Sequence, residues 1–290
     1  MFFIVIGLTG YLTNGYSDNK RWDGIQNALV IQRTLGSGEE VCHESKITLQ
    51  PGFVQCIIGD KSIEPDGVLW GDSLAAALSP GLNEELLLKK HSLYAIFNSG
   101  CIPIGGTYRP NYALCQKDIN EKFIQEFIKD KQLKKLIWFG SFHDLAEGGR
   151  VDYMIDGTES TPLLFEKKFK QTLDRFINVG KKVVIVGDTP RFPRPVAEYA
   201  IKSYLISDGK LDKTVQNISK QEQLNQTQNL NRILNDAMTK ALVVDGYSVF
   251  CNDDTCSSHD ANGDLMFVDK NHLSMPGAIK LGKVIADLLY

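Results

Sequence analysis

Three residues of this chain have the types and positions that nucleophilic catalysis needs. Ser73 comes shortly after the apolar run 67–70, and Asp269 and His272 lie three residues apart near the carboxyl end. A serine hydroxyl is a weak nucleophile at its ordinary pKa, and it needs a general base within hydrogen-bond reach. That base is normally a histidine that a carboxylate holds in the right tautomer. The set therefore predicts acyl chemistry at Ser73, with His272 as the base and Asp269 as the orienting carboxylate.

Each part of this set also has a purely structural interpretation. Ser73 is expected where a strand gives way to a helix, and serine is a favoured N-cap residue at such a position. An Asp-x-x-His segment is equally compatible with a solvated loop. The catalytic interpretation depends on both parts meeting at one place in the fold. The backbone N–H of Ser73, at the start of a helix, can then also face a developing oxyanion.

The elements that must position these residues alternate between strands and helices. From residue 66 onward, short apolar runs alternate with amphipathic stretches, which is typical of a mainly parallel sheet covered by helices. Five runs are predicted as strands: 67–70, 93–97, 135–139, 182–186 and 247–250. The sequence thus predicts an α/β domain with a five-stranded sheet over residues 66–290.

Both parts of the candidate site are predicted to lie at one edge of this sheet. Ser73 follows the strand 67–70 and precedes a short helix, predicted over 74–78, that ends before Pro80. The Asp-x-x-His segment directly precedes the closing helix, predicted over 276–290. Open α/β folds bind their ligands at the carboxyl edge of the strands, where both parts can meet.

The composition excludes some classes of partner. The 290 residues are 43% hydrophobic and 23% charged, as in an ordinary globular protein long enough to bury a full core. The net charge is −3, the pI is about 6.0, and the lysines are spread along the chain. Because no basic patch is present in the sequence, we expect no nucleic-acid partner.

Six cysteines fall into three local pairs: Cys42 and Cys56, Cys101 and Cys115, Cys251 and Cys256. Six thiols allow many pairings, so spacing alone leaves open either disulfides in an oxidising compartment or reduced thiols in the cytosol. None of the spacings is a CxxC pair, and no histidine stands at the offset of a structural zinc site. A metal cage is therefore disfavoured.

The first residues form an apolar run, 1–8, much shorter than the about 20 residues that a membrane-spanning helix needs. The run fits a buried strand or the end of a membrane helix. A signal peptide fits poorly, because no Lys or Arg precedes the run and no small-residue cleavage site follows it. The polar stretch 13–65 is predicted as a connecting segment with room for one hairpin.

The apolar strand, Gly71-Asp72-Ser73, the following helix and the late Asp-x-x-His segment together resemble the SGNH hydrolase superfamily, over residues 66–290. The resemblance implies a flavodoxin-like three-layer α/β/α sandwich, with a Ser73, Asp269 and His272 triad. Gly100 corresponds to the second sequence block, which implies that its N–H and that of Ser73 form the oxyanion hole. A turn glycine after a strand is the structural alternative for Gly100.

The chain is more similar still to the SGNH domain that follows the membrane acyltransferase module of bacterial O-antigen and peptidoglycan O-acetyltransferases. Four segments carry this likeness: the Trp-Gly-Asp-Ser strand end, residues 99–103 with Cys115 after them, the Cys251 and Cys256 pair, and residues 269–278. The likeness implies three disulfides: Cys42–Cys56, Cys101–Cys115 and Cys251–Cys256.

The same likeness implies a domain organisation and a setting. Residues 1–15 would be the remnant of a membrane helix, 16–65 a cysteine-containing linker and 66–290 the catalytic domain. In such proteins the membrane module delivers the acyl donor, and the acceptor is a glycan at the periplasmic or extracellular face of the bacterial inner membrane. No metal or other cofactor is implied.

The chain departs from this pattern at two places. Leu74 stands where the subgroup usually has a histidine, and the third block, after the strand 135–139, offers no asparagine to the oxyanion hole. A missing donor can cost a few kcal/mol of transition-state stabilisation. We therefore expect a lower rate rather than the loss of catalysis.

Three further residues are candidates for the site because of their positions alone. His143 follows a strand at the edge that faces the site, and Arg191 and Arg194 lie in a proline-rich loop from which they could contact an anionic glycan. A solvated or structural role is the alternative for each.

Together these observations predict an O-acyltransferase domain. It would move an acyl group, expected to be acetyl, through an acyl-serine onto a hydroxyl of a cell-surface glycan such as an O-antigen sugar. A carbohydrate acetyl esterase would use the same triad with water as the acceptor, and the sequence leaves both open. A non-catalytic glycan-binding domain on the same scaffold is a third alternative, motivated by Leu74 and the missing asparagine.

Overall fold

A six-stranded sheet forms the centre of the computed structural model, which describes residues 54–206 and 217–290. The strands are β1 (Val54–Gly59), β2 (Gly67–Gly71), β3 (Ser92–Phe97), β5 (Lys135–Phe139), β8 (Lys182–Val186) and β10 (Leu242–Val244). Their order is β1-β3-β2-β5-β8-β10, and only β1 is antiparallel to its neighbour. The five parallel strands thus follow the flavodoxin order, which confirms the predicted fold class.

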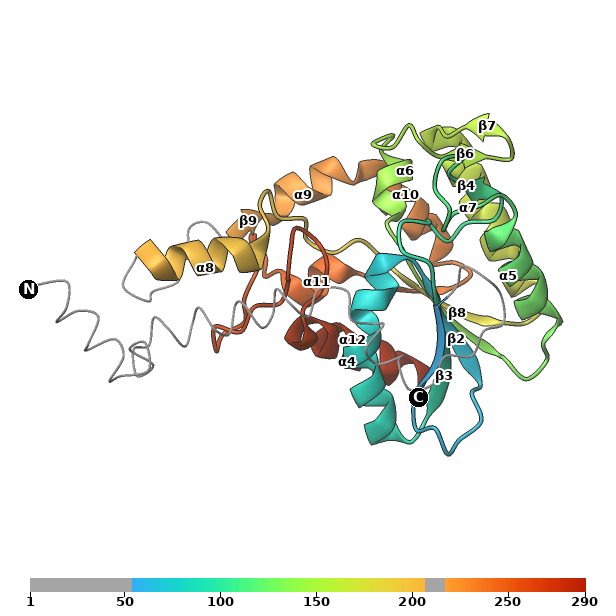
Figure 1. Cartoon of the computed structure of the whole chain (residues 1–290), viewed down its shortest axis with the longest axis horizontal. Helices are drawn as coiled ribbons and strands as arrows, with labels where there is room; N and C mark the ends of the chain where they lie inside the picture. Colours follow the sequence, from blue (N-terminus) through green and yellow to red (C-terminus); the bar gives the residue numbers. More distant parts are fainter. Residues whose placement is uncertain (1–53, 207–216) are drawn as a thin grey trace, which may run out of the picture.

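Helices cover both faces of the sheet. They are α4 (Ser73–Lys89), α5 (Ile119–Lys129), α6 (Phe142–Ala146), α7 (Pro162–Ile177), α8 (Val196–Ile206), α9 (Lys220–Gln226), α10 (Gln228–Ala237), α11 (Gly246–Phe250) and α12 (Met275–Leu289). Helices α4 and α12 pack on one face, whereas α5, α7 and α10 pack on the other (Figure 1). Strand side chains alternate between the two cores, so Leu69 contacts the first while Val68 and Trp70 contact the second.

Two small sheets lie outside the central one. The strands β4 (Thr107–Tyr108), β6 (Met154–Ile155) and β7 (Thr158–Glu159) form a three-stranded sheet. The strand β9 (Asn217–Ser219) pairs with β11 (Thr255–Ser257).

The helix that begins at Ser73 is much longer than predicted. It continues through Pro80, where we expected it to stop, and ends at Lys89. Proline has no N–H to donate to the carbonyl of Ala76, but the hydroxyl of Ser79 donates to that carbonyl at 2.9 Å instead. Gly81 then lets α12 approach closely, since a Cβ atom on it would lie 2.1 Å from the carbonyl carbon of Ala278.

Two further predictions about the sheet are wrong. Residues 247–250 belong to helix α11, which Asp245 caps through its side chain, and the last strand is β10, just before it. The sheet also begins before residue 66, because β1 lies in the stretch predicted as a linker. The proposed membrane-helix remnant, residues 1–15, lies outside the described residues.

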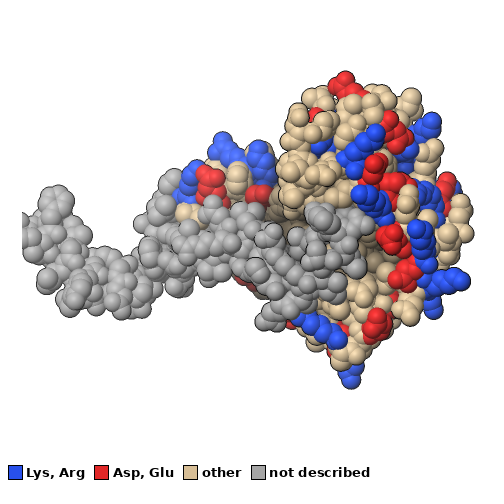
Figure 2. Space-filling view, turned by 45° about the vertical axis from the view of Figure 1, so that its right-hand side comes forward, with Lys and Arg blue, Asp and Glu red and all other residues tan. Residues whose placement is uncertain are grey.

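The surface shows no segregation of charge on the face in view. Acidic and basic side chains are interspersed there (Figure 2). Within residues 54–206 and 217–290, no helix is long and apolar enough to cross a bilayer.

Candidate active site

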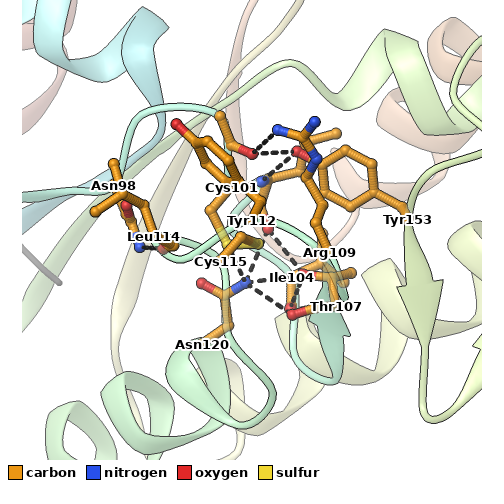
Figure 3. Close-up of a disulfide and its surroundings, with 12 residues drawn as sticks. Asn98, Cys101, Ile104, Thr107, Arg109, Tyr112, Leu114, Cys115, Asn120 and Tyr153 are labelled. Atoms are coloured by element: carbon orange, nitrogen blue, oxygen red, sulfur yellow. Dashed lines mark hydrogen bonds between the residues drawn. A yellow bond between two sulfur atoms is a disulfide. The ribbon is translucent and has the colours of Figure 1, made fainter.

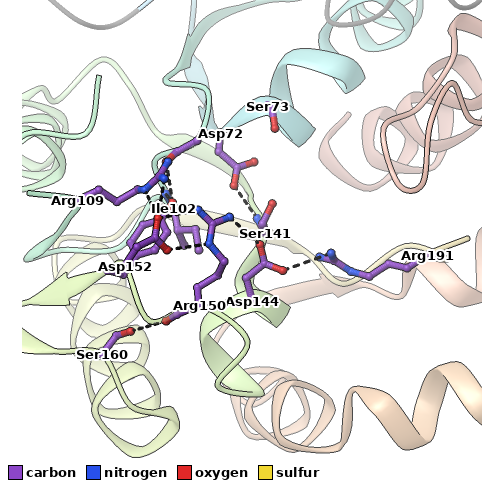
Figure 4. Close-up of polar contacts among 12 residues, drawn as sticks. Asp72, Ser73, Ile102, Arg109, Ser141, Asp144, Arg150, Asp152, Ser160 and Arg191 are labelled. Carbon is purple, nitrogen blue, oxygen red and sulfur yellow. Dashed lines mark hydrogen bonds and ion pairs between the residues drawn. The ribbon is translucent and has the colours of Figure 1, made fainter. Parts of the chain in front are cut away.

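Ser73 is the first residue of α4, at the carboxyl end of β2. Asp72, only 2% exposed, caps the helix: its Oδ1 atom accepts the N–H of Leu74 at 2.9 Å. Its Oδ2 atom accepts the N–H of Ser141 at 2.8 Å, which ties the end of β2 to the end of β5 (Figure 4). The turn needs glycine at position 71, because a Cβ atom there would lie 1.9 Å from the carbonyl oxygen of Phe139.

The structure brings the three predicted residues together. The Nε2 atom of His272 lies 2.8 Å from the Oγ atom of Ser73, and its Nδ1 atom lies 2.8 Å from Oδ2 of Asp269. The other carboxylate oxygen of Asp269 accepts the backbone N–H groups of Asn271 and His272 at 3.0 and 2.8 Å. With Nδ1 protonated, Nε2 is free to accept the proton of Ser73.

The loop that carries His272 is held from two sides. Within it, the N–H of Val268 donates to the carbonyl of His272 at 2.9 Å. From outside, the segment after β8 pairs with it, because the N–H of Phe192 donates to the carbonyl of Lys270 at 2.7 Å. The loop that carries His272 is therefore held by backbone hydrogen bonds.

The pair of Asp269 and His272 shifts the pKa of both groups. Burial raises the pKa of Asp269, but the hydrogen bond and charge of His272, with the backbone N–H groups of Asn271 and His272, lower it to about 2. Burial lowers the pKa of His272, but the hydrogen bond and charge of Asp269 raise it above 6.5. Asp269 is therefore ionised at neutral pH and stabilises the imidazolium that forms when His272 takes a proton.

The backbone N–H groups of Ser73 and Gly100 are the predicted oxyanion donors. Among residues 54–206 and 217–290, neither the N–H of Ser73 nor that of Gly100 has a protein acceptor. Gly100 follows β3 with φ +71°, a conformation that favours glycine. The predicted donors are thus both without intramolecular partners in the described part of the chain.

The third block contributes no side-chain amide, as its sequence indicates. The backbone N–H of Ser141 is engaged by Asp72, and Phe142 is 1% exposed in the core. The third block therefore contributes no side-chain amide, and the N–H of Ser141 is not free for an oxyanion.

The other polar candidates are only partly paired. The Nδ1 atom of His143 lies 3.6 Å from Oδ2 of Asp188 and has no hydrogen-bond partner among the described residues, and burial lowers the pKa of His143 despite that carboxylate. Arg191 bridges Asp188 and Asp144 at 3.4 and 3.3 Å, and Figure 4 shows its contact with Asp144. Arg194 is exposed and lies over the ring of Tyr199, 5.1 Å from its centroid. Because two carboxylates already pair with Arg191, it is not a free cation awaiting a glycan.

Sequence reasoning missed Asp188 and the role of Asp72. Both residues follow a glycine directly after a buried parallel strand, at Gly71-Asp72 and Gly187-Asp188. This repeated strand-Gly-Asp pattern was a signal that could have placed both carboxylates at the active edge of the sheet.

Two of the three predicted disulfides are present, Cys101–Cys115 and Cys251–Cys256. The predicted Cys42–Cys56 bond includes Cys42, which lies outside the described residues. Within the described part of the chain, no group of three His, Cys, Asp or Glu side chains could hold a metal ion.

Three solved structures are similar to this chain. The periplasmic domain of a lipopolysaccharide acetyltransferase from Salmonella serovar Paratyphi A has a TM-score of 0.58 at 18% identity, covering 78% of this chain and 85% of that one. A carbohydrate acetylesterase from Sinorhizobium meliloti has a TM-score of 0.42 at 14% identity, covering 78% and 98%. An aryl esterase from M. smegmatis has a TM-score of 0.45 at 14% identity, with the same coverage.

No curated protein matches the sequence. A family model does: the SGNH domain that is fused to AT3 domains matches residues 41–287. The chain therefore belongs to this family of SGNH domains.

Proposed function

We propose that the chain is an O-acyltransferase domain that moves an acyl group through Ser73 onto a hydroxyl of a cell-surface glycan. The observation that carries this proposal is the continuous hydrogen-bonded chain from Ser73 through His272 to Asp269, with 2.8 Å at each contact. The family's fusion to AT3 domains supports transfer, because a membrane acyltransferase module would supply the acyl donor at the periplasmic or extracellular face.

In the first half-reaction, Oγ of Ser73 attacks the carbonyl carbon of the acyl donor while Nε2 of His272 takes its proton. The carbonyl oxygen becomes an oxyanion, which accepts the N–H groups of Ser73 and Gly100. When the tetrahedral intermediate collapses, the bond to the leaving group breaks, and His272 returns the proton to that group.

In the second half-reaction, a sugar hydroxyl attacks the acyl-serine. Nε2 of His272 now takes the proton of that hydroxyl, and a second oxyanion forms in the same place. Collapse releases the sugar ester, and His272 gives the proton back to Oγ of Ser73. Protons, charge and electrons balance over the two half-reactions, so the cycle needs only the acyl donor and the sugar acceptor.

The first test is intact-protein mass spectrometry after the domain reacts with a p-nitrophenyl acyl ester, beside Ser73→Ala and His272→Ala. We expect one acyl adduct that maps to Ser73 and is missing from both variants. No adduct on folded wild-type protein would contradict the proposal and favour a glycan-binding domain.

A chase of the acyl-enzyme separates transfer from hydrolysis. Adding candidate glycans should speed the loss of the adduct and yield an acylated sugar. If the adduct is lost only to water, and at one rate with every glycan, the domain is an esterase.

A further inference from the structure

The two peptide groups that flank Gly100 are held by side chains. The carbonyl of Ser99 accepts the hydroxyl of Tyr112 at 3.1 Å. The carbonyl of Gly100 accepts the hydroxyl of Tyr153 at 2.7 Å and the Nη1 atom of Arg109 at 3.3 Å. The carbonyl groups of Ser99 and Gly100 are therefore both held by side chains from outside the turn.

These contacts fix the direction of the Gly100 N–H. In a trans peptide, the C=O of one residue and the N–H of the next share a rigid plane and point in opposite directions. The hydroxyl that holds the Ser99 carbonyl thus also sets where the Gly100 N–H points. Tyr153 and Arg109 hold the carbonyl of Gly100, and so they fix the peptide plane that follows the glycine. The backbone of Gly100 is therefore held on both sides.

The three side chains are themselves held in place. Arg109 donates to one carboxylate oxygen of Asp152 through Nε at 2.8 Å and Nη2 at 2.6 Å. Its guanidinium lies over the ring of Tyr112, 4.4 Å from the centroid. Tyr153 is 1% exposed, and its oxygen accepts the N–H of Ile102 at 3.3 Å.

A disulfide closes the segment that carries two of these side chains. Cys101 follows Gly100 directly and bonds to Cys115, whose carbonyl accepts the N–H of Arg109 at 2.8 Å. Figure 3 shows Arg109, Tyr112 and Tyr153 gathered beside this disulfide. The hydrogen bonds of Arg150 and Arg109 lower the pKa of Asp152 to about 2, so the carboxylate that anchors Arg109 is ionised at physiological pH.

We infer that Tyr112, Tyr153 and Arg109 are positioning residues that hold the Gly100 N–H toward the oxyanion. The inference rests on the proposed function. It accounts for how a site without the asparagine donor would still present a second donor in a fixed direction: an N–H group stabilises an oxyanion only if it is aligned before charge develops.

The size of the effect follows from what is lost. Removing a whole oxyanion donor lowers kcat by about 10²–10³-fold. Removing one hydroxyl that aligns the donor leaves it present but less well directed. We therefore expect a fall in kcat of roughly tenfold for Tyr112→Phe or Tyr153→Phe, less than for loss of a whole donor.

The test compares these variants with Tyr94→Phe as the matched control, because Tyr94 lies in the middle of β3, away from the turn. The substrate is p-nitrophenyl acetate, and kcat, KM, the pH profile and the thermal midpoint are measured. A trifluoromethyl ketone, which forms a tetrahedral alkoxide on a reactive serine, reports on the oxyanion hole. In both variants we expect a lower kcat and an equally weakened inhibitor, with unchanged KM and pH profile, whereas Tyr94→Phe matches wild type.

The outcomes separate the inference from the proposed function. If wild type acylates Ser73 but both variants keep the wild-type kcat and inhibitor affinity, the inference is wrong and the proposed function stands. If wild type forms no acyl adduct, the proposed function itself fails. Should Tyr153→Phe unfold because Tyr153 is buried, the half-buried Tyr112→Phe decides the matter alone.

Discussion

The Oγ atom of Ser73 and the Nε2 atom of His272 lie 2.8 Å apart, although 199 positions separate them in the chain. Ser73 is fixed by the start of α4, and His272 by a loop that precedes α12. These two helices pack against each other on one face of the sheet. The contact between serine and base thus depends on the same packing that stabilises the domain.

The acylation of Ser73 should depend on pH through His272. Only the unprotonated Nε2 atom can take the serine proton, so kcat/KM should fall as the pH drops through the pKa of His272, which lies above 6.5. Because Asp269 raises this pKa, Asp269→Asn should move the acid limb to lower pH. The same change should lower kcat by about 10²–10⁴-fold, since it removes the group that orients the imidazole.

The matched control for this prediction is Asp174→Asn, which removes a carboxylate from an exposed ion pair with Lys240. This substitution should leave both the acid limb of the pH profile of kcat/KM and the value of kcat unchanged. An acid limb that stays at the wild-type pH in Asp269→Asn would mean that another group controls the titration.

The sequence predicted the meeting of Ser73, Asp269 and His272 better than it predicted the elements around them. These residues stand out because nucleophilic catalysis requires particular residue types, and their positions beside predicted elements place them at one edge of the sheet. The predicted length of helix α4 is too short because Pro80 is a strong local stop signal. In the structure, the hydroxyl of Ser79 replaces the hydrogen bond that Pro80 cannot make. Such compensation depends on a side-chain rotamer, which local pattern does not reveal.

Two errors in the sheet have different causes. Residues 247–250 are aromatic and β-branched enough to suggest a strand, but the side chain of Asp245 accepts the N–H of Tyr247 at 3.0 Å and begins a helix. The strand β1 did carry a signal, because Cys56 and Ile58 alternate into one core. Because the residues before β1 are polar, the whole stretch was predicted as a linker. The pairing of β1 with β3 joins segments far apart in the sequence, so a local sequence pattern does not reveal it.

Asp72→Asn should destabilise the domain because both carboxylate oxygens accept a backbone N–H. An amide has only one oxygen, so its NH₂ group must face the N–H of either Leu74 or Ser141. A buried donor without an acceptor costs about 1–3 kcal/mol. We expect a loss of that size in the free energy of unfolding, measured by urea denaturation, and a lower acylation rate because the start of α4 is less well held.

Asp245→Asn is the control for this change. Asp245 caps α11 with a single oxygen, which asparagine also offers. Asparagine and aspartate are about equally good N-caps, so the free energy of unfolding should change little. Equal losses in the two variants would show that the second acceptor of Asp72 contributes nothing.

Gly81→Ala should destabilise the domain at the crossing of α4 and α12. Alanine gains about 1 kcal/mol in helix propensity. Its methyl group, however, would lie 2.1 Å from backbone atoms of Ala278, and Gly282 marks the same close approach from α12. Overpacking of this kind costs about 1–3 kcal/mol or more, so we expect a net loss in chemical denaturation.

The comparison for this glycine is Gly149→Ala. Gly149 is exposed, and a Cβ atom there would lie 3.5 Å from its nearest neighbour, the carbonyl oxygen of Asp144. Its free energy of unfolding should stay within about 0.5 kcal/mol of wild type. A neutral Gly81→Ala would show that the two helices can move apart at no cost.

The two disulfides should differ in what their removal does. Cys101–Cys115 spans 14 positions and Cys251–Cys256 spans 5, so chain entropy predicts losses of about 3 and about 2 kcal/mol in the free energy of unfolding. The first bond also closes the segment that carries Arg109 and Tyr112. Replacing both of its cysteines by serine should therefore lower the acylation rate of Ser73 at a temperature where the variant is folded. The Cys251→Ser, Cys256→Ser protein should lose stability but keep the wild-type acylation rate. Equal acylation rates in the two double variants would show that the Cys101–Cys115 bond has no part in aligning Gly100.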